Sequence, residues 1–451
     1  MLMGLLERAY YIFRPWTPAR VLYHPAYFDV LSLLRNWDSD NDLLEKAINA
    51  RLRFILSEAI THVPFYRDAI KLSVDEINKC DTPVELLNLF PFLEKETVMD
   101  QQDRFLSDRY RGKRIYYVTS GGSSGQGIGL WRSKHLADIE KAFFAWERER
   151  FGFSVERSRS LRIGANARRK ANESPIWRLG KQLMLSPYHV NEQWREEILN
   201  RLNEYKPEFI DAYPSSLYEL TKLLESDQLD FQPRAIFLAS EPVLDYQLEK
   251  IYDKFRVPIS INYGLTERTN LAFAEYDKGL KRGYRMNPLY GYAENRRVHG
   301  QFEIVGTSLW NDVMPLIRYC TADFGLLSEK GEIDEIDGRA QEFLVDKFGS
   351  RIPGLSIIID EPTWDFVKYY QVTQSQPGVI KILLVPKRGS LTEEQRSYVL
   401  GNQQKRWGEF FDISVHEVEN IPLTSAGKRR LVMTEIKSEK VAQSANLQIT
   451  R

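Results

Sequence analysis

Two stretches in the middle of the chain, FIDAYPSSLYELTKLL (209–224) and AIFLASEPVLDYQLEKIYDKFRVPISINYGLTE (235–267), decide the fold. Short apolar runs alternate in them with segments of helical periodicity. They predict strands at Phe209–Asp211, Ala235–Ala239 and Ile259–Asn262, and helices at Leu217–Glu225 and Leu244–Phe255. Such alternation predicts a parallel sheet with helices on its faces. Ligands of these sheets bind at the carboxyl ends of the strands, so we expect the site in the loops after Ala239 and Asn262.

Upstream of this region the chain is predicted to be helical to about residue 100. Apolar residues recur at helical spacing from Leu52 to Ile60, and Pro64 ends the run. A further helix is predicted at Lys134–Arg150.

Downstream the pattern changes twice. Short strands without helices between Gly300 and Leu327 predict a small antiparallel sheet. A compact α+β unit of conventional domain size should follow. Its predicted elements are a hairpin of Phe366–Thr373 and Val379–Val385, a helix at Thr392–Trp407 and a strand at Ile413–Val418.

We therefore expect an α/β protein of two domains. The N-terminal domain, residues 1–338, should hold mixed and parallel sheets flanked by helices, and it divides into a helical part (1–100), an α/β core (101–298) and a small antiparallel β subdomain (299–338). Residues 339–451 should form a small α+β domain. A length of 451 residues is too great for one compact core.

Composition excludes several classes of protein. Lys+Arg and Asp+Glu both number 62, which argues against a nucleic-acid-binding protein. Two distant cysteines form no disulfide framework and favour a cytoplasmic location, and the histidines lack metal-ligand spacing. No apolar run approaches the roughly 20 residues of a transmembrane helix. The N-terminal MLMGLLERAYYIFRPW is a poor signal peptide that can pack in the core or lie on the inner face of a membrane.

A loop rich in serine and glycine, TSGGSSGQG (119–127), follows a predicted strand at Arg114–Val118 and precedes another at Ile128–Trp131. Its backbone N–H groups and hydroxyls can surround phosphate oxygens. It is neither a Walker A loop nor a dinucleotide fingerprint, and a flexible hairpin loop would have a similar sequence.

Four more segments contain residues suited to nucleotide chemistry. In INYGLTE (261–267), a tyrosine can stack on a base, a threonine can bind phosphate and a glutamate can bind Mg²⁺, although Thr266 can equally cap a helix. In RYCTAD (318–323), Asp323 can accept ribose hydroxyls or lie in an ordinary turn. Gly338-Arg339 lies at the inferred domain joint, and PLTSAGKRR (422–430) presents Lys428, which alone would be taken for a solvated charge.

In this order and spacing, the five segments resemble the motifs of the adenylate-forming superfamily of acyl-CoA synthetases, adenylation domains and luciferases. The segments ITHVPFYRDAI (60–70), FPFLEKETV (90–98), FIDAYPSSLYELTKLL and LASEPVLDY (238–246) are similar to the phenylacetate–CoA ligase and CapK-like branch. The resemblance covers most of the chain. It implies that the C-terminal domain is a mobile lid.

The resemblance also implies roles for residues of this chain. Those implied to hold the phosphates of ATP are Thr119, Ser120, Gly121, Gly122, Ser123, Ser124 and Gly125. Those implied to border the adenine are Ser240, Glu241, Pro242, Tyr263 and Gly264. Asp323 would bind the ribose with Arg339 nearby, Thr266 would contact phosphate, and Glu267 would bind Mg²⁺. Lys428 would reach the α-phosphate and the attacking carboxylate.

Four departures from the family pattern stand out. Gly122 replaces the usual first threonine of the phosphate loop, and no lysine follows that loop. Ala322 replaces the glycine before Asp323, and Gln341 stands where a hinge aspartate is common. The change at Gln341 concerns the hinge motion that the family uses and leaves the expected adenylation unaffected. Gly349 matches a glycine of CoA-using members.

The resemblance implies an ATP- and Mg²⁺-dependent enzyme that converts a carboxylic acid to an acyl-AMP and transfers the acyl group. An amine acceptor would make it an amide-forming enzyme of surface polysaccharide biosynthesis, the role associated with CapK-like members. A thiol acceptor would make it an acyl-CoA or aryl-CoA ligase, with CoA as a further cofactor. A non-catalytic nucleotide-binding protein is the third alternative. Tyr188, His189, Tyr213 and Asn262 are candidate walls of the acyl pocket, or ordinary packing.

Overall fold

The computed structural model describes residues 17, 19–37, 41–119, 128–164, 167, 169–170, 172–298, 300–336, 343–353, 357, 359, 361–422 and 430–436. Among these residues, no helix is both long and apolar enough to cross a lipid bilayer.

Helices dominate the first hundred residues, as predicted. They are α2 (Ala19–Leu22), α3 (Pro25–Arg35), α4 (Asn41–His62), α5 (Pro64–Ala69), α6 (Val74–Lys79), η2 (Glu85–Leu89), α7 (Lys95–Asp100), α8 (Gln102–Phe105) and η3 (Asp108–Tyr110). Pro64 ends the predicted run and also opens α5, because the first position of a helix needs no backbone donor. The buried face of α4, including Leu52, Ile55 and Leu56, packs into one core cluster.

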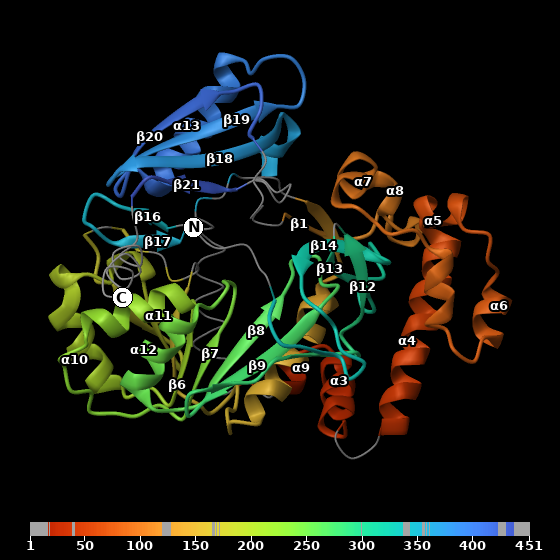
Figure 1. Cartoon of the computed structure of the whole chain (residues 1–451), viewed down its shortest axis with the longest axis horizontal. Helices are drawn as coiled ribbons and strands as arrows, with labels where there is room; N and C mark the ends of the chain where they lie inside the picture. The colour runs from red at the N-terminus through yellow and green to blue at the C-terminus, as the bar shows by residue number, and fades with distance from the viewer. Residues whose placement is uncertain are drawn as a thin grey trace, which may run out of the picture.

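A hairpin of β1 (Tyr116–Thr119) and β2 (Gly129–Arg132) comes next, paired antiparallel from Tyr116–Arg132 to Thr119–Gly129. It brackets residues 120–127, which lie outside the described part of the chain. The predicted helix follows as α9 (Lys134–Glu149), with Leu136, Ile139 and Phe143 buried along one face. Figure 1 shows α9 beside α3, near the large sheet.

The large sheet has the strand order β15-β11-β9-β8-β7-β6-β3-β5-β4, with β10 on the edge of β9. Its strands are β3 (Ser160–Ile163), β4 (Ile176–Leu179), β5 (Gln182–Leu185), β6 (Phe209–Ala212), β7 (Ala235–Leu238), β8 (Ile259–Gly264), β9 (Leu271–Asp277), β10 (Leu280–Lys281), β11 (Tyr284–Met286) and β15 (Glu332–Ile333). The run β5-β3-β6-β7-β8 is parallel, as the alternating pattern predicted. Strands β6 and β7 are buried throughout, and the one charged residue in them, Asp211 of β6, is paired with Arg148 and Arg162.

Helices α10 (Arg195–Tyr205), α11 (Pro214–Leu223) and α12 (Asp245–Phe255) connect the parallel strands and cover the sheet (Figure 1). Short 3₁₀ turns, η4 (Pro187–His189) and η5 (Glu192–Trp194), precede α10. Leu217 and Leu220 of α11 and Ile251 of α12 pack on the sheet in one core cluster. The predicted helices and strands of this region lie within three residues of the observed ones.

A separate antiparallel sheet contains β12 (Gly291–Val298), β13 (Gln301–Ser308) and β14 (Tyr319–Phe324). It confirms the short strands predicted between 300 and 327. The first strand of this sheet, β12, was not predicted, because its sequence GYAENRRV has no alternation of apolar and polar residues.

The last part of the chain forms an α+β unit. Its elements are β16 (Phe343–Val345), β17 (Arg351–Pro353), η7 (Glu361–Asp365), β18 (Val367–Gln376), β19 (Val379–Pro386), α13 (Glu393–Trp407), β20 (Asp412–Glu417) and β21 (Val432–Thr434). The predicted hairpin is β18–β19, and Gly378 supplies the positive φ of 75° in its turn. Tyr188 of η4 also packs in the core of this unit, so the two parts of the molecule meet there.

The predicted fold class, α/β with an additional small antiparallel sheet and a terminal α+β unit, is confirmed. The boundaries near residues 100, 298 and 338 and the mobility of the last unit stay predictions. The joint itself, residues 337–342, lies outside the described part, and Arg339 and Gln341 with it.

Candidate active site

The two loops expected to form the site lie at one edge of the large sheet. Strands β7 and β8 are parallel neighbours, paired from Ile236–Ile259 to Leu238–Ile261. Their carboxyl ends therefore point the same way and bring the loop of Ser240 next to Tyr263. Ser240 has a φ of 73°, which is strained for a residue with a side chain.

Tyr263 connects this edge to the antiparallel sheet. Its hydroxyl donates to Oδ2 of Asp323 on β14 at 3.1 Å. Burial, reinforced by the adjacent Asp323 carboxylate, raises the pKa of Tyr263 well above its usual value. The hydroxyl therefore remains protonated at neutral pH and fixes one oxygen of the Asp323 carboxylate.

A second hydrogen bond joins the same two motifs. Tyr319 of β14 donates its hydroxyl to Oε1 of Glu267 at 3.0 Å, and Glu267 is only 9% exposed. Two segments more than fifty residues apart in the sequence, INYGLTE and RYCTAD, thus make reciprocal contacts. Their carboxylates, Glu267 and Asp323, belong to one site.

Ala322, which stands where the family pattern has glycine, adopts a backbone conformation that favours glycine. Ala322 has a φ of 58°, in the left-handed region that favours glycine, and its N–H donates to Glu303 at 2.9 Å. The N–H of Asp323 donates to the hydroxyl of Thr321 at 3.1 Å. A glycine at this position would adopt the same conformation without strain.

Arg318 has a structural role. Its guanidinium binds both carboxylate oxygens of Glu294, at 2.9 and 2.8 Å, and lies over the ring of Phe92. These contacts hold the start of β14 against the N-terminal helical region.

Glu241 lies in the loop after β7, and its side chain is buried against the first turn of α11. Its Oε2 accepts the backbone N–H of Ser215 at 3.1 Å, and its Oε1 has no hydrogen-bond partner among the described residues. Burial raises the pKa of Glu241 to about 7 against the lowering effect of Ser215. The carboxyl group thus acts as a helix cap whose charge changes near neutral pH.

Arg132 lies beside the candidate site and was not predicted from the sequence. Its guanidinium donates to the backbone carbonyl of Thr266, beside Glu267. Burial, together with the nearby Arg268, lowers the pKa of Arg132 to about 10, so it keeps its charge at neutral pH. Arg268 pairs with Glu140 of α9 at 2.6 Å. Its position in the sequence could have indicated it, because Arg132 is the first basic residue after the serine- and glycine-rich loop.

The chain is similar to known proteins in both sequence and fold. Residues 349–435 match the family model described as the CapK C-terminal domain. The chain is 22% identical over 438 residues to protein CapK of Staphylococcus aureus, a match covering 92% of this chain and 94% of the relative. A solved structure of 2-hydroxyisobutyryl-CoA ligase in complex with 2-HIB-AMP and CoA aligns with a TM-score of 0.50 at 14% identity, covering 91% of this chain and 94% of that one.

The chain is similar to CapK along most of its length, and it shares the fold of 2-hydroxyisobutyryl-CoA ligase.

Several residues predicted for the site of this CapK-like chain lie outside the described residues. They are Ser120, Gly121, Gly122, Ser123, Ser124, Gly125, Arg339 and Lys428. Thr119 is described and ends β1 opposite Gly129. The structure brings together Tyr263, Gly264, Thr266, Glu267 and Asp323, with Ser240, Glu241 and Pro242 in the neighbouring loop.

Two of the four candidate walls of the acyl pocket are core residues. Tyr188 is 2% exposed and packs edge-on against Trp407, at 4.9 Å between ring centroids. The ring nitrogens of His189 contact Ser186 Oγ and the carbonyl of Lys170 at 2.8 and 2.9 Å. Tyr213 precedes α11, and Asn262 of β8 has a buried Nδ2 without a hydrogen-bond partner among the described residues. These two remain candidates.

Proposed function

We propose that this CapK-like chain is an AMP-forming ligase. A carboxylic acid attacks the α-phosphate of ATP, pyrophosphate leaves, and the acyl group of the resulting acyl-AMP passes to an acceptor. The observation that supports this most directly is the pair of hydrogen bonds Tyr263–Asp323 and Tyr319–Glu267. They place two carboxylates of different motifs at the carboxyl edge of a parallel sheet, where ligands of such sheets bind.

We assign the nucleotide to this edge. The half-buried Asp323, oriented by Tyr263, is suited to accept the ribose hydroxyls, and the loop Ser240–Pro242 with Tyr263 and Gly264 would border the adenine. The serine- and glycine-rich loop between β1 and β2, from Thr119 to Gly125, would surround the phosphates. Arg339 would lie near the ribose.

Mg²⁺ fits the available donors. Among the described residues, no cluster of three or more His, Cys, Asp and Glu side chains could hold a metal ion. Mg²⁺ bound with nucleotides needs no such cluster, since one or two carboxylates, phosphate oxygens and water complete its shell. Glu267, held by Tyr319 and next to Thr266, would supply the carboxylate.

The chemical problem is the approach of two anions, the carboxylate and the α-phosphate. Preorganised cations lower this barrier, and each such group contributes a few kcal/mol, about 3 in comparable sites. Arg132, which donates to the carbonyl of Thr266, compensates for the missing lysine after the phosphate loop in our proposal. Lys428 would be the second cation, delivered by the C-terminal unit.

We propose the domain division 1–338 and 339–451, with the second unit as a mobile lid that brings Lys428 to the site. The packing of Tyr188 against Trp407 gives one contact between the two parts. A cytoplasmic location is supported by the free cysteines Cys80 and Cys320.

For the acceptor we propose an amine, in amide formation for surface polysaccharide biosynthesis, on the basis of the similarity to CapK. A CoA thiol is the alternative, supported by the fold shared with a CoA ligase. Gly349 does not help to choose, because its φ of 81° alone accounts for a glycine there.

Hydroxylamine trapping tests the proposal. Purified protein with MgATP is offered amino acids, uronic acids and aryl acids, and the hydroxamates are measured. One acid should give hydroxamate and AMP in equal amounts. Replacing hydroxylamine by CoA or by amines then identifies the acceptor. Tight ATP binding without hydroxamate from any acid would favour the non-catalytic nucleotide-binding alternative.

A further inference from the structure

A second cavity lies at the opposite end of the parallel strands. It has a volume of about 150 Å³, and Ser160 and Gln182, the first residues of β3 and β5, pair with each other on its wall. The candidate active site lies at the carboxyl ends of the neighbouring β7 and β8. Because these strands are all parallel, the cavity is at the amino edge of the same sheet.

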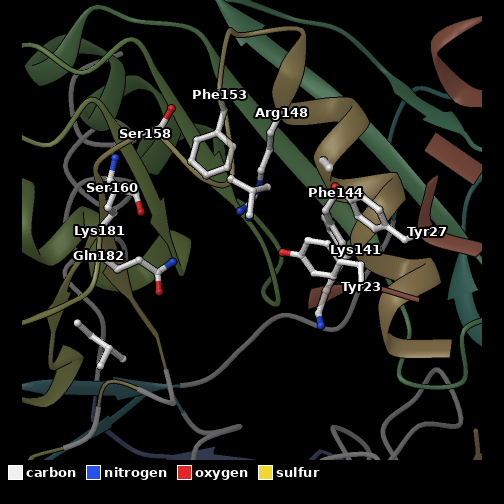
Figure 2. Close-up of a pocket in the computed structure, with 13 residues that line it drawn as sticks. Tyr23, Tyr27, Lys141, Phe144, Arg148, Phe153, Ser158, Ser160, Lys181 and Gln182 are labelled. Carbon is white, nitrogen blue, oxygen red and sulfur yellow. The ribbon is translucent and has the colours of Figure 1, made fainter. Parts of the chain in front are cut away.

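Two structural layers form the cavity. Figure 2 shows Tyr23, Tyr27 and Lys141 on one side and Ser160, Lys181 and Gln182 on the other. The first group comes from the α2–α3 region and α9, and the second from the strands. A volume of about 150 Å³ is on the order of ten times what one water molecule requires, so the cavity accepts a molecule of roughly ten non-hydrogen atoms.

Lys181 brings a positive charge to this wall. It occupies the two-residue turn between β4 and β5, after Gly180 with a φ of 61°. Its ammonium donates to the carbonyl of Arg157 at 3.1 Å. Within the described part of the chain it has no carboxylate at ion-pair distance, so this contact leaves its charge uncompensated.

Two further cations come from α9. Arg148 shares the buried Asp211 with Arg162, so one carboxylate faces two guanidinium groups. Lys141 pairs with Asp138 at 2.8 Å and lies 5.4 Å from the ring centroid of Tyr23. Together with Lys181, Lys141 and Arg148 line the cavity with three cations, of which Lys141 is paired with Asp138.

The remaining lining is mixed. Phe144 and Phe153 supply apolar surface, and Ser158, Ser160 and Gln182 supply groups that hydrogen-bond to hydroxyls. Burial raises the pKa of the Tyr27 hydroxyl, so it stays a neutral donor. Convergent polar groups on an apolar floor are typical of small-molecule sites.

We propose that this cavity binds a small hydroxylated organic anion, a carboxylate or phosphate attracted by the positive charges of Lys181 and Lys141 on its two sides, with its hydroxyls toward Ser160 and Gln182. The site is separate from the nucleotide edge and does not depend on the adenylation proposed above.

Calorimetric titration of the full chain tests this site with three probes: 3-phosphoglycerate, glycerol 3-phosphate and glycerate. Glycerol is the neutral control. At least one anion should bind, and glycerol should not. The phosphate and carboxylate arms show which anion the site prefers.

Charge-removing variants locate the binding. Lys181→Gln and Lys141→Gln should each weaken it about ten-fold, the loss of one charge-assisted contact. Lys405→Gln, on the exposed face of α13, should leave it unchanged. Melting curves check that each variant is folded. The proposal is overturned if no anion binds more tightly than about 10 mM, or if all three variants bind alike.

Discussion

Glu241 couples the site to pH. A free glutamate has a pKa of about 4.3, whereas burial raises the pKa of Glu241 to about 7 in the folded protein. Between these two values the folded state binds the extra proton, so the free energy of unfolding falls as the pH rises through this window. The loss amounts to about 4 kcal/mol once Glu241 is fully ionised.

Glu241→Gln should remove this dependence, because the amide keeps an acceptor for the N–H of Ser215 and never ionises. Relative to the variant, the wild type should lose stability from about pH 5 to about pH 8, as measured by urea unfolding. The control Glu329→Gln, on an exposed loop, should track the wild type. Parallel pH profiles of Glu241→Gln and wild type would contradict the shifted pKa.

Ala322 carries backbone strain at a φ of 58°. The left-handed conformation costs a residue with a side chain about 1–2 kcal/mol, partly offset by the entropy that glycine loses on folding. Ala322→Gly should therefore stabilise the protein by about 0.5–1 kcal/mol, seen as a higher melting temperature. Ala293→Gly in β12 is the control and should destabilise it, and equal effects at both positions would refute the strain.

At the scale of elements, β14 contacts the loop that follows β8 through the hydrogen bond of Tyr319 to Glu267. Tyr319→Phe removes the donor to Glu267 and leaves the ring packing in place. We expect pyrophosphate exchange to slow about ten-fold and the Mg²⁺ requirement to rise, with ATP binding little changed. Tyr276→Phe on β9 is the matched control. An unchanged Mg²⁺ titration would remove Tyr319 from its positioning role.

The parallel core was predictable because its strands are buried on both faces. Strand β7 is a continuous apolar run and β6 is apolar except for Asp211, and the helices between the strands fix the order and direction of pairing. Strand β12 was missed because half-buried polar residues such as Glu294, Asn295 and Arg296 fill it. The partners of those residues lie on other elements, Arg318 for Glu294 and Glu303 for Arg296, which a local pattern does not contain.

Tyr263, Glu267 and Asp323 could be proposed as site residues from the sequence because their motifs resemble a family pattern, and their roles stay predictions. Their hydrogen bonds and the contact of Arg132 depend on packing between distant segments. Tyr188 illustrates the converse, since its place in the sequence suggested a pocket wall and its packing on Trp407 makes it a core residue. Sequence similarity indicates which residues matter, and the fold decides which of them touch.

At the scale of the whole molecule, we expect two distant parts of the chain to act on one nucleotide. The sheet edge contributes Asp323 and Glu267, and the C-terminal unit would contribute Lys428. The two parts are in contact through Tyr188 and through Asn191, whose side chain donates to Ser350 Oγ at 3.1 Å. Each part alone should therefore be inactive in adenylation.

ATP–pyrophosphate exchange is the most direct test of this account, with wild type, Asp323→Asn and Lys428→Ala assayed against amino acids, uronic acids and aryl acids. One acid should stimulate exchange in the wild type, and each variant should lose about a hundred-fold or more, the effect of removing one group that stabilises the transition state. Asp323→Asn should also weaken ATP binding. No exchange with any acid, or full exchange in both variants, would contradict adenylation at this site.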